Sequence, residues 1–223
     1  MQICVVIPTY NESKAIASLV EKIRQQELEV VVVDDGSGDN TSGIASDNGA
    51  IVLRNLTNQG KGASLVRGFQ YALSRDFDAV ITMDGDGQHL PEEIPYFIGL
   101  ATHSNSGILI GNRMSKITNM PYMRVLANKL MSWLISFAAG QSIPDTQCGF
   151  RLIKKEVLKK INLKTSKYET ESEIIIKASR LGFKIKSVPI KTVYEGEKSQ
   201  INPIIDTLRF IKFITRELWT MKS

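Results

Sequence analysis

The chain has 223 residues, of which 43% are hydrophobic and 23% charged, and its formal net charge is +5. This composition excludes a disordered or fibrous protein and supplies enough apolar residues for a folded core. The modest basic excess fits anionic partners such as nucleotides, phosphates or an acidic membrane surface, and fits an ordinary solvated surface equally well. No basic run is interleaved with aromatic residues, so we expect no nucleic-acid partner.

Cysteine usage and the N-terminus bear on the location of the protein. Cys4 and Cys148 are far apart and fit no zinc or redox spacing, so we expect no disulfide framework and a cytoplasmic location. No basic region or cleavage site follows Met1, which predicts the absence of a signal peptide. The longest apolar stretch, 130–139, is shorter than the ~20 residues of a membrane span, so we expect no transmembrane helix.

Strand and helix patterns alternate along the first half of the chain. Short β-rich runs predict strands over residues 2–8, 29–33, 51–53, 78–83 and 107–110. Apolar residues at helical spacing predict helices over residues 12–26, 61–73 and 91–101. Alternation at this spacing indicates βαβ units, with right-handed crossovers and helices on both faces. We therefore predict an α/β fold, a single Rossmann-like domain with a mainly parallel central sheet.

The regularity loosens after Pro121. The next helix carries a stripe of apolar residues formed by Met123, Leu126, Leu130, Trp133 and Phe137. We then expect a loop over 145–151, a helix over 168–181, a strand over 185–193 and a terminal helix over 203–221. Neither a linker nor an internal repeat divides the chain.

Two acidic turns directly follow predicted strands. The first contains Asp34 and Asp35, and the second is Asp84-Gly85-Asp86-Gly87-Gln88-His89. Open α/β sheets bind ligands at the carboxyl ends of their strands. Carboxylate oxygens suit Mg²⁺ or Mn²⁺, and glycines allow a turn to bring two carboxylates together. An isolated Asp-x-Asp is more often a solvated turn, but its place after a strand and the second acidic turn favour a metal site.

Two further features have ordinary alternatives. A carboxylate at Asp35 suits hydrogen bonding to a base or ribose, whereas Asp39 and Thr41 are typical of a simple helix start. Gly60-Lys61-Gly62 opens a helix but lacks the Walker A spacing. A lysine at a helix N-terminus attracts phosphate, and the same residues are equally typical of a plain loop.

Six motifs occur in order along the chain. They are Pro8-Thr9-Tyr10-Asn11-Glu12, Asp34-Asp35-Gly36-Ser37, Asn58 with Gly60-Lys61-Gly62, Asp84 to His89 with Pro91-Glu92, Gly111-Asn112-Arg113, and Asp145-x-x-x-Gly149-Phe150. Together they resemble family 2 glycosyltransferases of the GT-A fold, over roughly residues 1 to 200. Within that family the chain is most similar to dolichyl-phosphate mannose synthases and bacterial polyprenyl-phosphate glycosyltransferases.

The resemblance implies roles for individual residues. The nucleotide sugar would be held by Pro8, Tyr10, Glu12, Val33, Asp35, Asp84 and Gly85. A Mg²⁺ or Mn²⁺ ion would be held by Asp84, Asp86 and Gln88. Phosphate groups would be contacted by Arg113, Arg124 and Lys198. The residues expected to carry the chemistry are Asp86, Arg113 and Glu171.

The chain departs from the pattern near its end. The synthases tend to show a Gly-Glu-Ser-Lys turn after an arginine, whereas this chain has Tyr194-Glu195-Gly196-Glu197-Lys198-Ser199. The resemblance also implies a division of the chain. Residues 1–115 would form the nucleotide-sugar and metal half of a domain that ends at residue 202, residues 116–202 its acceptor half, and residues 203–223 a basic amphipathic helix.

The acceptor decides whether a catalytic base is needed. A lipid phosphate such as polyprenyl or dolichyl phosphate is already anionic and needs none, whereas a hydroxyl of a glycan needs a carboxylate base. Glu169, Glu171 and Glu173 are candidates, and acidic residues at a helix N-terminus are also favoured by its dipole. We expect inverting transfer of a hexose from a UDP- or GDP-linked donor to a lipid phosphate. The alternatives are a hydroxyl acceptor, a sugar nucleotidyltransferase and a binding module without catalysis.

The terminal helix supports a membrane hypothesis. It places Ile204, Leu208, Ile211, Ile214 and Leu218 on one stripe. The adjacent stripe carries Arg209, Lys212 and Arg216. Such a helix lies in a membrane interface or packs on the domain with its cations in water. We therefore expect a location that is cytoplasmic or peripheral on the cytoplasmic face of the membrane.

Overall fold

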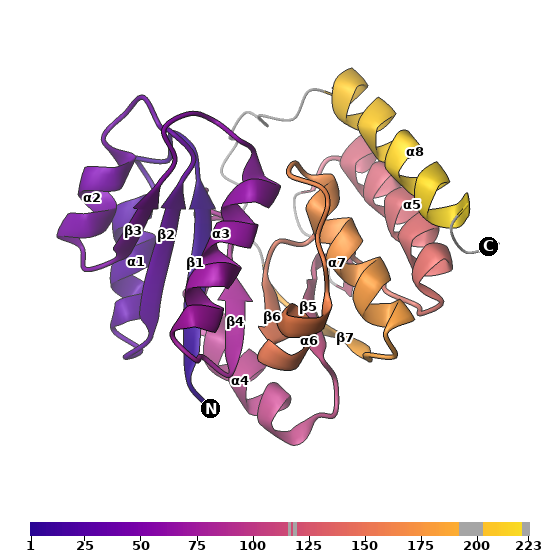
Figure 1. The fold of residues 1–223 in the computed structure, drawn as a ribbon, viewed down its shortest axis with the longest axis horizontal. Coiled ribbons are helices and arrows are strands. Elements are labelled where there is room, and N and C mark those ends of the chain that lie inside the picture. Colours follow the sequence, from indigo (N-terminus) through magenta and orange to yellow (C-terminus); the bar gives the residue numbers. More distant parts are fainter. Residues whose placement is uncertain (116, 118–119, 192–202, 220–223) are drawn as a thin grey trace.

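The computed structural model describes residues 1–115, 117, 120–191 and 203–219, with the side chains of 209–217 in the last segment. These residues form a seven-stranded sheet with the order β3-β2-β1-β4-β6-β5-β7. The strands are β1 (Ile3–Thr9), β2 (Glu29–Asp34), β3 (Ile51–Arg54), β4 (Ala79–Thr82), β5 (Ile108–Asn112), β6 (Arg151–Lys154) and β7 (Ile185–Pro189). The predicted α/β class with a mainly parallel sheet is confirmed (Figure 1).

Helices cover both faces of the sheet. They are α1 (Ile16–Arg24), α2 (Thr41–Asp47), α3 (Lys61–Ser74), α4 (Ile94–His103), α5 (Tyr122–Ala139), α6 (Lys155–Lys160), α7 (Glu169–Arg180) and α8 (Pro203–Trp219). There are also two 3₁₀ turns: η1 (Pro91–Glu93) precedes α4, and η2 (Arg113–Ser115) follows β5. Right-handed crossovers put α1 and α3 on opposite faces of the sheet. The reason is that the connection from β1 to β2 and the connection from β3 to β4 cross the sheet in opposite directions.

The N-terminal half of the sheet is parallel and buried. β1 lies between β2 and β4, and all of its residues are buried. The valines of β2, residues 30–33, have no exposed surface, which explains their continuous apolar run. In the register of these strands Thr9 is paired with Asp34 and Pro8 with Val33. The turns that follow β1, β2 and β4 therefore emerge at one edge of the sheet.

The second half of the sheet contains a strand that we did not predict. Residues 145–151 were expected to form a loop, but Arg151 begins β6, which runs antiparallel to both β4 and β5. Leu152 and Ile153 have no exposed surface, and the short helix α6 follows directly. β6 has two apolar residues between charged ends, too short a run for a periodic signal. Its reversed direction places the start of the strand at the edge where β4 ends.

Three helices pack together beside the C-terminal half of the sheet. α5 contacts α7 and α8, and α8 also contacts α7 (Figure 1). α8 buries Phe210, Phe213 and Ile214, while Ile211, a member of the predicted apolar stripe, is 52% exposed. Arg180 of α7 forms an ion pair with Glu217 of α8, with 2.7 Å between Nη1 and Oε2, and this pair stabilises the contact between the two helices.

Two sequence predictions concern the membrane and the thiols. No helix in the described part of the chain is both long and apolar enough to cross a membrane. Cys4 and Cys148 are both free and buried. Burial raises the pKa of each thiol to about 12, so both behave as small core residues at neutral pH.

Candidate active site

The Asp35 carboxylate is held by the loop that leads into α3. It accepts hydrogen bonds from the backbone N–H groups of Gln59 (2.9 Å) and Gly60 (2.7 Å) and from the side-chain amide of Asn55 (2.8 Å). Its own N–H donates to the carbonyl oxygen of Thr9 at the end of β1 (2.9 Å). With 3% of its surface exposed, Asp35 is a fixed anchor that joins three segments of the chain.

The second acidic turn packs against the same end of β1. A Cβ atom on Gly85 would lie 2.7 Å from Cγ2 of Thr9, so a larger residue would push the turn away from β1. A Cβ atom on Gly149 would lie 2.5 Å from one carboxylate oxygen of Asp84 and 2.6 Å from the other. Both glycines therefore allow a close backbone approach to the acidic turn.

Lys61 connects the two acidic turns. It follows Gly60, whose N–H binds Asp35, and its ammonium lies 2.6 Å from Oδ1 of Asp84 and 2.9 Å from Oε2 of Glu171. Burial alone would raise the pKa of Asp84, but the nearby Lys61 cation holds it well below its usual range. Burial alone would lower the pKa of Lys61, and the two carboxylates instead raise it. Asp84 and Lys61 therefore remain an ion pair at neutral pH.

Arg151 fixes the far side of the site. It is 1% exposed, and its guanidinium donates to the carbonyl oxygens of Cys148 (2.8 Å), Thr146 (2.9 Å) and Glu171 (2.7 Å). Its Nη2 atom also lies 3.5 Å from Oε1 of Glu171. The Glu171 carboxylate is thus placed between the cations of Lys61 and Arg151, at the first turn of α7.

His89 supports the Asp84 turn from inside the protein. The Asp84 N–H donates to Nδ1 of His89 at 3.3 Å, and the ring stacks at a tilt on Phe150, with 5.7 Å between centroids. Burial lowers the pKa of His89 to about 4, because the neighbouring Asp84 only partly offsets the desolvation. His89 is therefore neutral at pH 7, as its role as a hydrogen-bond acceptor requires.

Arg113 and Asp145 form a buried bidentate pair. Nε and Nη2 of the guanidinium lie 2.8 and 2.9 Å from the two carboxylate oxygens, and the Arg113 N–H adds a third bond at 3.0 Å. Arg113 is 8% exposed and Asp145 is not exposed. Asp145 also begins the segment that brings Gly149 to Asp84, so this pair positions both the end of β5 and the segment before β6.

The donor set at the second turn fits a hard divalent cation. Asp84 and Asp86 supply carboxylate oxygens, and the Gln88 N–H binds Oδ1 of Asp86 at 3.0 Å. Among residues 1–115, 117, 120–191 and 203–219, no group of three or more His, Cys, Asp or Glu side chains is arranged to hold a metal by itself. Two carboxylates fit an ion of the Mg²⁺ type, which keeps positions for substrate phosphates and water. Because Oδ1 of Asp84 binds Lys61, Oδ2 is the oxygen that the ion pair leaves available.

Comparison with known proteins identifies the family. A family model described as Glycosyl transferase family 2 matches residues 4–162, which is more than half of the chain. The chain belongs to glycosyl transferase family 2. It is 30% identical over 215 residues to a UDP-N-acetylglucosamine–dolichyl-phosphate N-acetylglucosaminyltransferase of Methanococcus voltae, covering 86% of each chain. It is also 30% identical over 200 residues to a polyprenol monophosphomannose synthase of Mycolicibacterium smegmatis, covering 83% of this chain and 75% of that protein.

Solved structures show the same fold. The glucosyl-3-phosphoglycerate synthase of Mycobacterium tuberculosis, crystallised with Mn²⁺, UDP and phosphoglyceric acid, superposes with a TM-score of 0.75 at 21% identity. The match covers 98% of this chain and 78% of that one. At this identity the likeness shows the fold alone, and it is the GT-A fold.

The glycosyltransferase places its expected donor-binding residues at one edge. Tyr10 and Glu12 lie on the loop after β1. This loop is fixed by a hydrogen bond that the Glu12 N–H donates to Oγ1 of Thr41 (2.9 Å). Pro8 and Val33 are opposite each other in β1 and β2, and the side chain of Val33 has no exposed surface. Their roles in donor binding remain predictions.

Two of the three expected phosphate ligands belong to the described residues, and their surroundings differ. Arg113 is buried against Asp145, whereas Arg124 is exposed on the first turns of α5. Lys198 lies outside the described residues. Asp86, Arg113 and Glu171 remain candidate catalytic residues, and of these Glu171 contacts the Lys61–Asp84 pair directly.

The other two glutamates of α7 have separate positions. Glu173 is fully buried and accepts hydrogen bonds from the N–H of Lys164 and from the N–H and hydroxyl of Thr165. It also forms an ion pair with Lys177 at 2.6 Å. Glu173 therefore fixes the loop before α7 and is saturated by its partners. Glu169 is half-buried at the start of the helix.

Two residues of the site were given no firm role by the sequence. The sequence predicts either a phosphate ligand or a loop residue at Lys61, and its pairing with Asp84 joins positions 23 apart in the chain. Arg151 was placed at the end of a loop. One signal in the sequence indicates that Arg151 is buried. The arginine stands between a glycine-aromatic pair and two apolar residues, Leu152 and Ile153, in a segment where a solvent-exposed side chain is unexpected.

Proposed function

We propose that this glycosyltransferase transfers a hexose, with inversion, from a UDP- or GDP-linked donor to a polyprenyl or dolichyl phosphate, using Mg²⁺ or Mn²⁺. The observation that carries the proposal is the junction of the two acidic turns at one sheet edge, where Gly60 binds Asp35 and Lys61 binds Asp84. A nucleoside held near Asp35 would direct its diphosphate toward the Asp84 turn. The names of the archaeal and mycobacterial relatives support the acceptor class.

The residues of this chain divide the work of such a transfer. Asp84 and Asp86, with Gln88, would hold a divalent ion that neutralises the charge developing on the leaving diphosphate. Lys61 lies within 3 Å of both Asp84 and Glu171 and adds a cation at the same place. A phosphate acceptor is ionised at neutral pH, so Glu171 need not act as a base. Its position between Lys61 and Arg151 suits a residue that orients cations.

Transfer of a radiolabelled hexose to a short-chain prenyl phosphate tests the proposal. Asp86→Ala should abolish metal-dependent transfer, whereas Asp47→Ala, an exposed aspartate at the end of α2, should leave it unchanged. The configuration of the product at the anomeric carbon, read by NMR, should be opposite to that of the donor. A fully active Asp86→Ala variant would overturn the metal assignment.

The products separate the alternatives. Label that remains in the aqueous phase on a glycan indicates a hydroxyl acceptor, for which Glu171 would serve as the base. Release of pyrophosphate in place of a nucleoside diphosphate indicates nucleotidyl transfer. Either result would overturn the lipid-phosphate proposal.

A further inference from the structure

α5 exposes many of its large apolar side chains. Six of them are between 51% and 77% exposed: Tyr122, Met123, Leu126, Leu130, Trp133 and Phe137. At about 100° per residue these positions fall within an arc of roughly 100°, a single face that we name the α5 stripe. A helix on the surface of a globular protein normally turns such a face toward the core. The sequence predicts the stripe, but the structure places it outside.

The opposite face of α5 is the one that packs on the domain, and it is smaller and partly polar. Its buried residues are Val125, Asn128, Ser132, Ile135, Ala138 and Ala139. The Ser132 hydroxyl accepts a hydrogen bond from the Thr146 N–H at 2.9 Å, and Ser136 binds the N–H of Ile143 at 3.0 Å. α5 is therefore anchored by specific polar contacts in an orientation that leaves the α5 stripe uncovered by the described residues.

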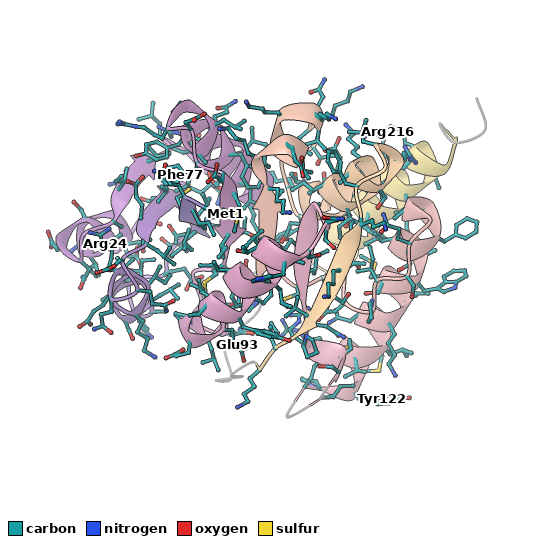
Figure 2. All side chains as sticks on the ribbon, turned by 90° about the horizontal axis from the view of Figure 1, so that it is seen from below. Met1, Arg24, Phe77, Glu93, Tyr122 and Arg216 are labelled. Atoms are coloured by element: carbon teal, nitrogen blue, oxygen red, sulfur yellow. The ribbon has the colours of Figure 1, made fainter. Side chains whose placement is uncertain are left out.

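The charge around the α5 stripe is positive. α5 contains no aspartate or glutamate, and its Arg124 and Lys129 are exposed. The adjacent helix α8 exposes Arg209, Lys212 and Arg216. Among the described side chains of α8 the carboxylate is that of Glu217, which is buried against Arg180. Figure 2 shows Tyr122 at the edge of the molecule at one end of α5, and Arg216 on α8.

We propose that the α5 stripe inserts into the boundary between headgroups and acyl chains of an anionic lipid leaflet, with the exposed cations of α5 and α8 at the lipid phosphates. Interfacial helices combine Trp, Phe and Leu on one side with Lys and Arg beside them. The stripe runs over fifteen residue steps, about 23 Å, which suits a helix lying in the membrane plane. A two-fold contact between copies would instead bring these cations face to face.

This inference rests on the proposed function, because a polyprenyl phosphate resides in such a leaflet. The connection to the site is physical. Ser132 of α5 binds Thr146, and the same segment carries Gly149, which abuts the carboxylate of Asp84. A leaflet that holds α5 would therefore lie against the helix that packs on the segment beside Asp84.

Flotation with vesicles tests the surface directly. Wild-type protein should float with vesicles of phosphatidylglycerol and phosphatidylcholine, and less with phosphatidylcholine alone. Trp133→Asp should lower partitioning by about tenfold or more, because a buried aromatic side chain and an added charge both oppose insertion. The matched control is Tyr96→Asp, because this residue is 53% exposed and its helix, α4, lies apart from α5 and α8 (Figure 1). Equal partitioning of the two variants, or no flotation of the wild type, overturns the proposal.

A second readout reports insertion without a change in the α5 stripe. Trp219→Phe leaves Trp133 as the single tryptophan of the chain, which contains two. Its emission should shift to the blue on anionic vesicles and should be quenched by brominated lipid. Unchanged emission overturns the proposal. A wild-type dimer that Trp133→Asp converts to a monomer, measured by light scattering, would assign the stripe to a second copy and would also overturn it.

Turnover separates this inference from the proposed function. With a short, water-soluble prenyl phosphate and no vesicles, Trp133→Asp should transfer hexose at the wild-type rate. Protein that floats but transfers nothing refutes the proposed reaction and leaves the α5 surface supported. Protein that transfers hexose but does not float refutes the α5 surface alone.

Discussion

Replacing Lys61 by methionine removes the cation between two carboxylates. The Lys61, Asp84 and Glu171 side chains are 19%, 28% and 12% exposed. Breaking a fully buried pair costs about 3–5 kcal/mol. Because Asp84 is partly solvated and Arg151 remains 3.5 Å from Glu171, we expect a loss of about 2–4 kcal/mol here. For a chain of this size that lowers Tm by roughly 5–15 °C.

Thermal melts followed by circular dichroism measure this loss. The matched control is Lys22→Met, since Lys22 pairs with Glu92 at 3.4 Å but the two side chains are 48% and 62% exposed. A surface pair contributes at most about 1 kcal/mol, so the control should melt within a few degrees of wild type. Mn²⁺ should raise the Tm of Lys61→Met more than that of wild type, because a divalent ion replaces the missing charge. If both variants melt together, or Mn²⁺ acts equally on Lys61→Met and wild type, the central role of Lys61 is refuted.

Two further predictions concern packing and pH. Gly149→Ala should reduce transfer by about 100-fold and stability by about 1–3 kcal/mol, because the new methyl displaces the Asp84 carboxylate. The control is Gly99→Ala, where the added carbon meets no atom within 4 Å beyond its chain neighbours and the local backbone of α4, and it should do neither in the same rate and melting assays. Burial alone would raise the pKa of Glu173, but its hydrogen bonds from Lys177 and the loop N–H groups lower it below the ordinary 4.5. The stability that Glu173 contributes is therefore present above pH 4.5 and lost as the pH falls through the lowered pKa. Glu173→Gln should lower Tm at pH 7 and less so at pH 3, and an equal loss at both would contradict this reasoning.

The parallel half of the fold was predictable because its signals are local. The valine run of β2 and the apolar run of β1 are continuous, and strands buried on both faces require this. Strand ends then locate Asp35 and Asp84 at one edge without any knowledge of side-chain contacts. The same logic fails at β6, because Arg151 resembles a surface residue by type. Its burial follows only from carbonyl oxygens supplied by segments near 146, 148 and 171.

Periodicity defines the faces of a helix without saying what each face contacts. The α5 stripe has the spacing of a core-facing stripe, yet it is exposed, because the opposite face is held by Ser132 and its neighbours. Likewise, the spacing puts Glu169 and Glu173 on one face of the helix and Glu171 on another. It could not show that Glu171 meets Lys61 while Glu173 binds the loop at Thr165.

The antiparallel course of β6 has a consequence for how the active centre matures. The hydrogen bonds that hold Asp35 all lie within the first sixty residues, because its partners include Thr9, Asn55 and Gly60. The surroundings of Asp84 require Gly149, just before β6, and Glu171, beyond β6, and β6 lies between β4 and β5. Contacts this distant in sequence form slowly. A nascent chain would thus complete the proposed nucleoside site well before the proposed pyrophosphate site, which separates ligand affinity from catalytic competence in time.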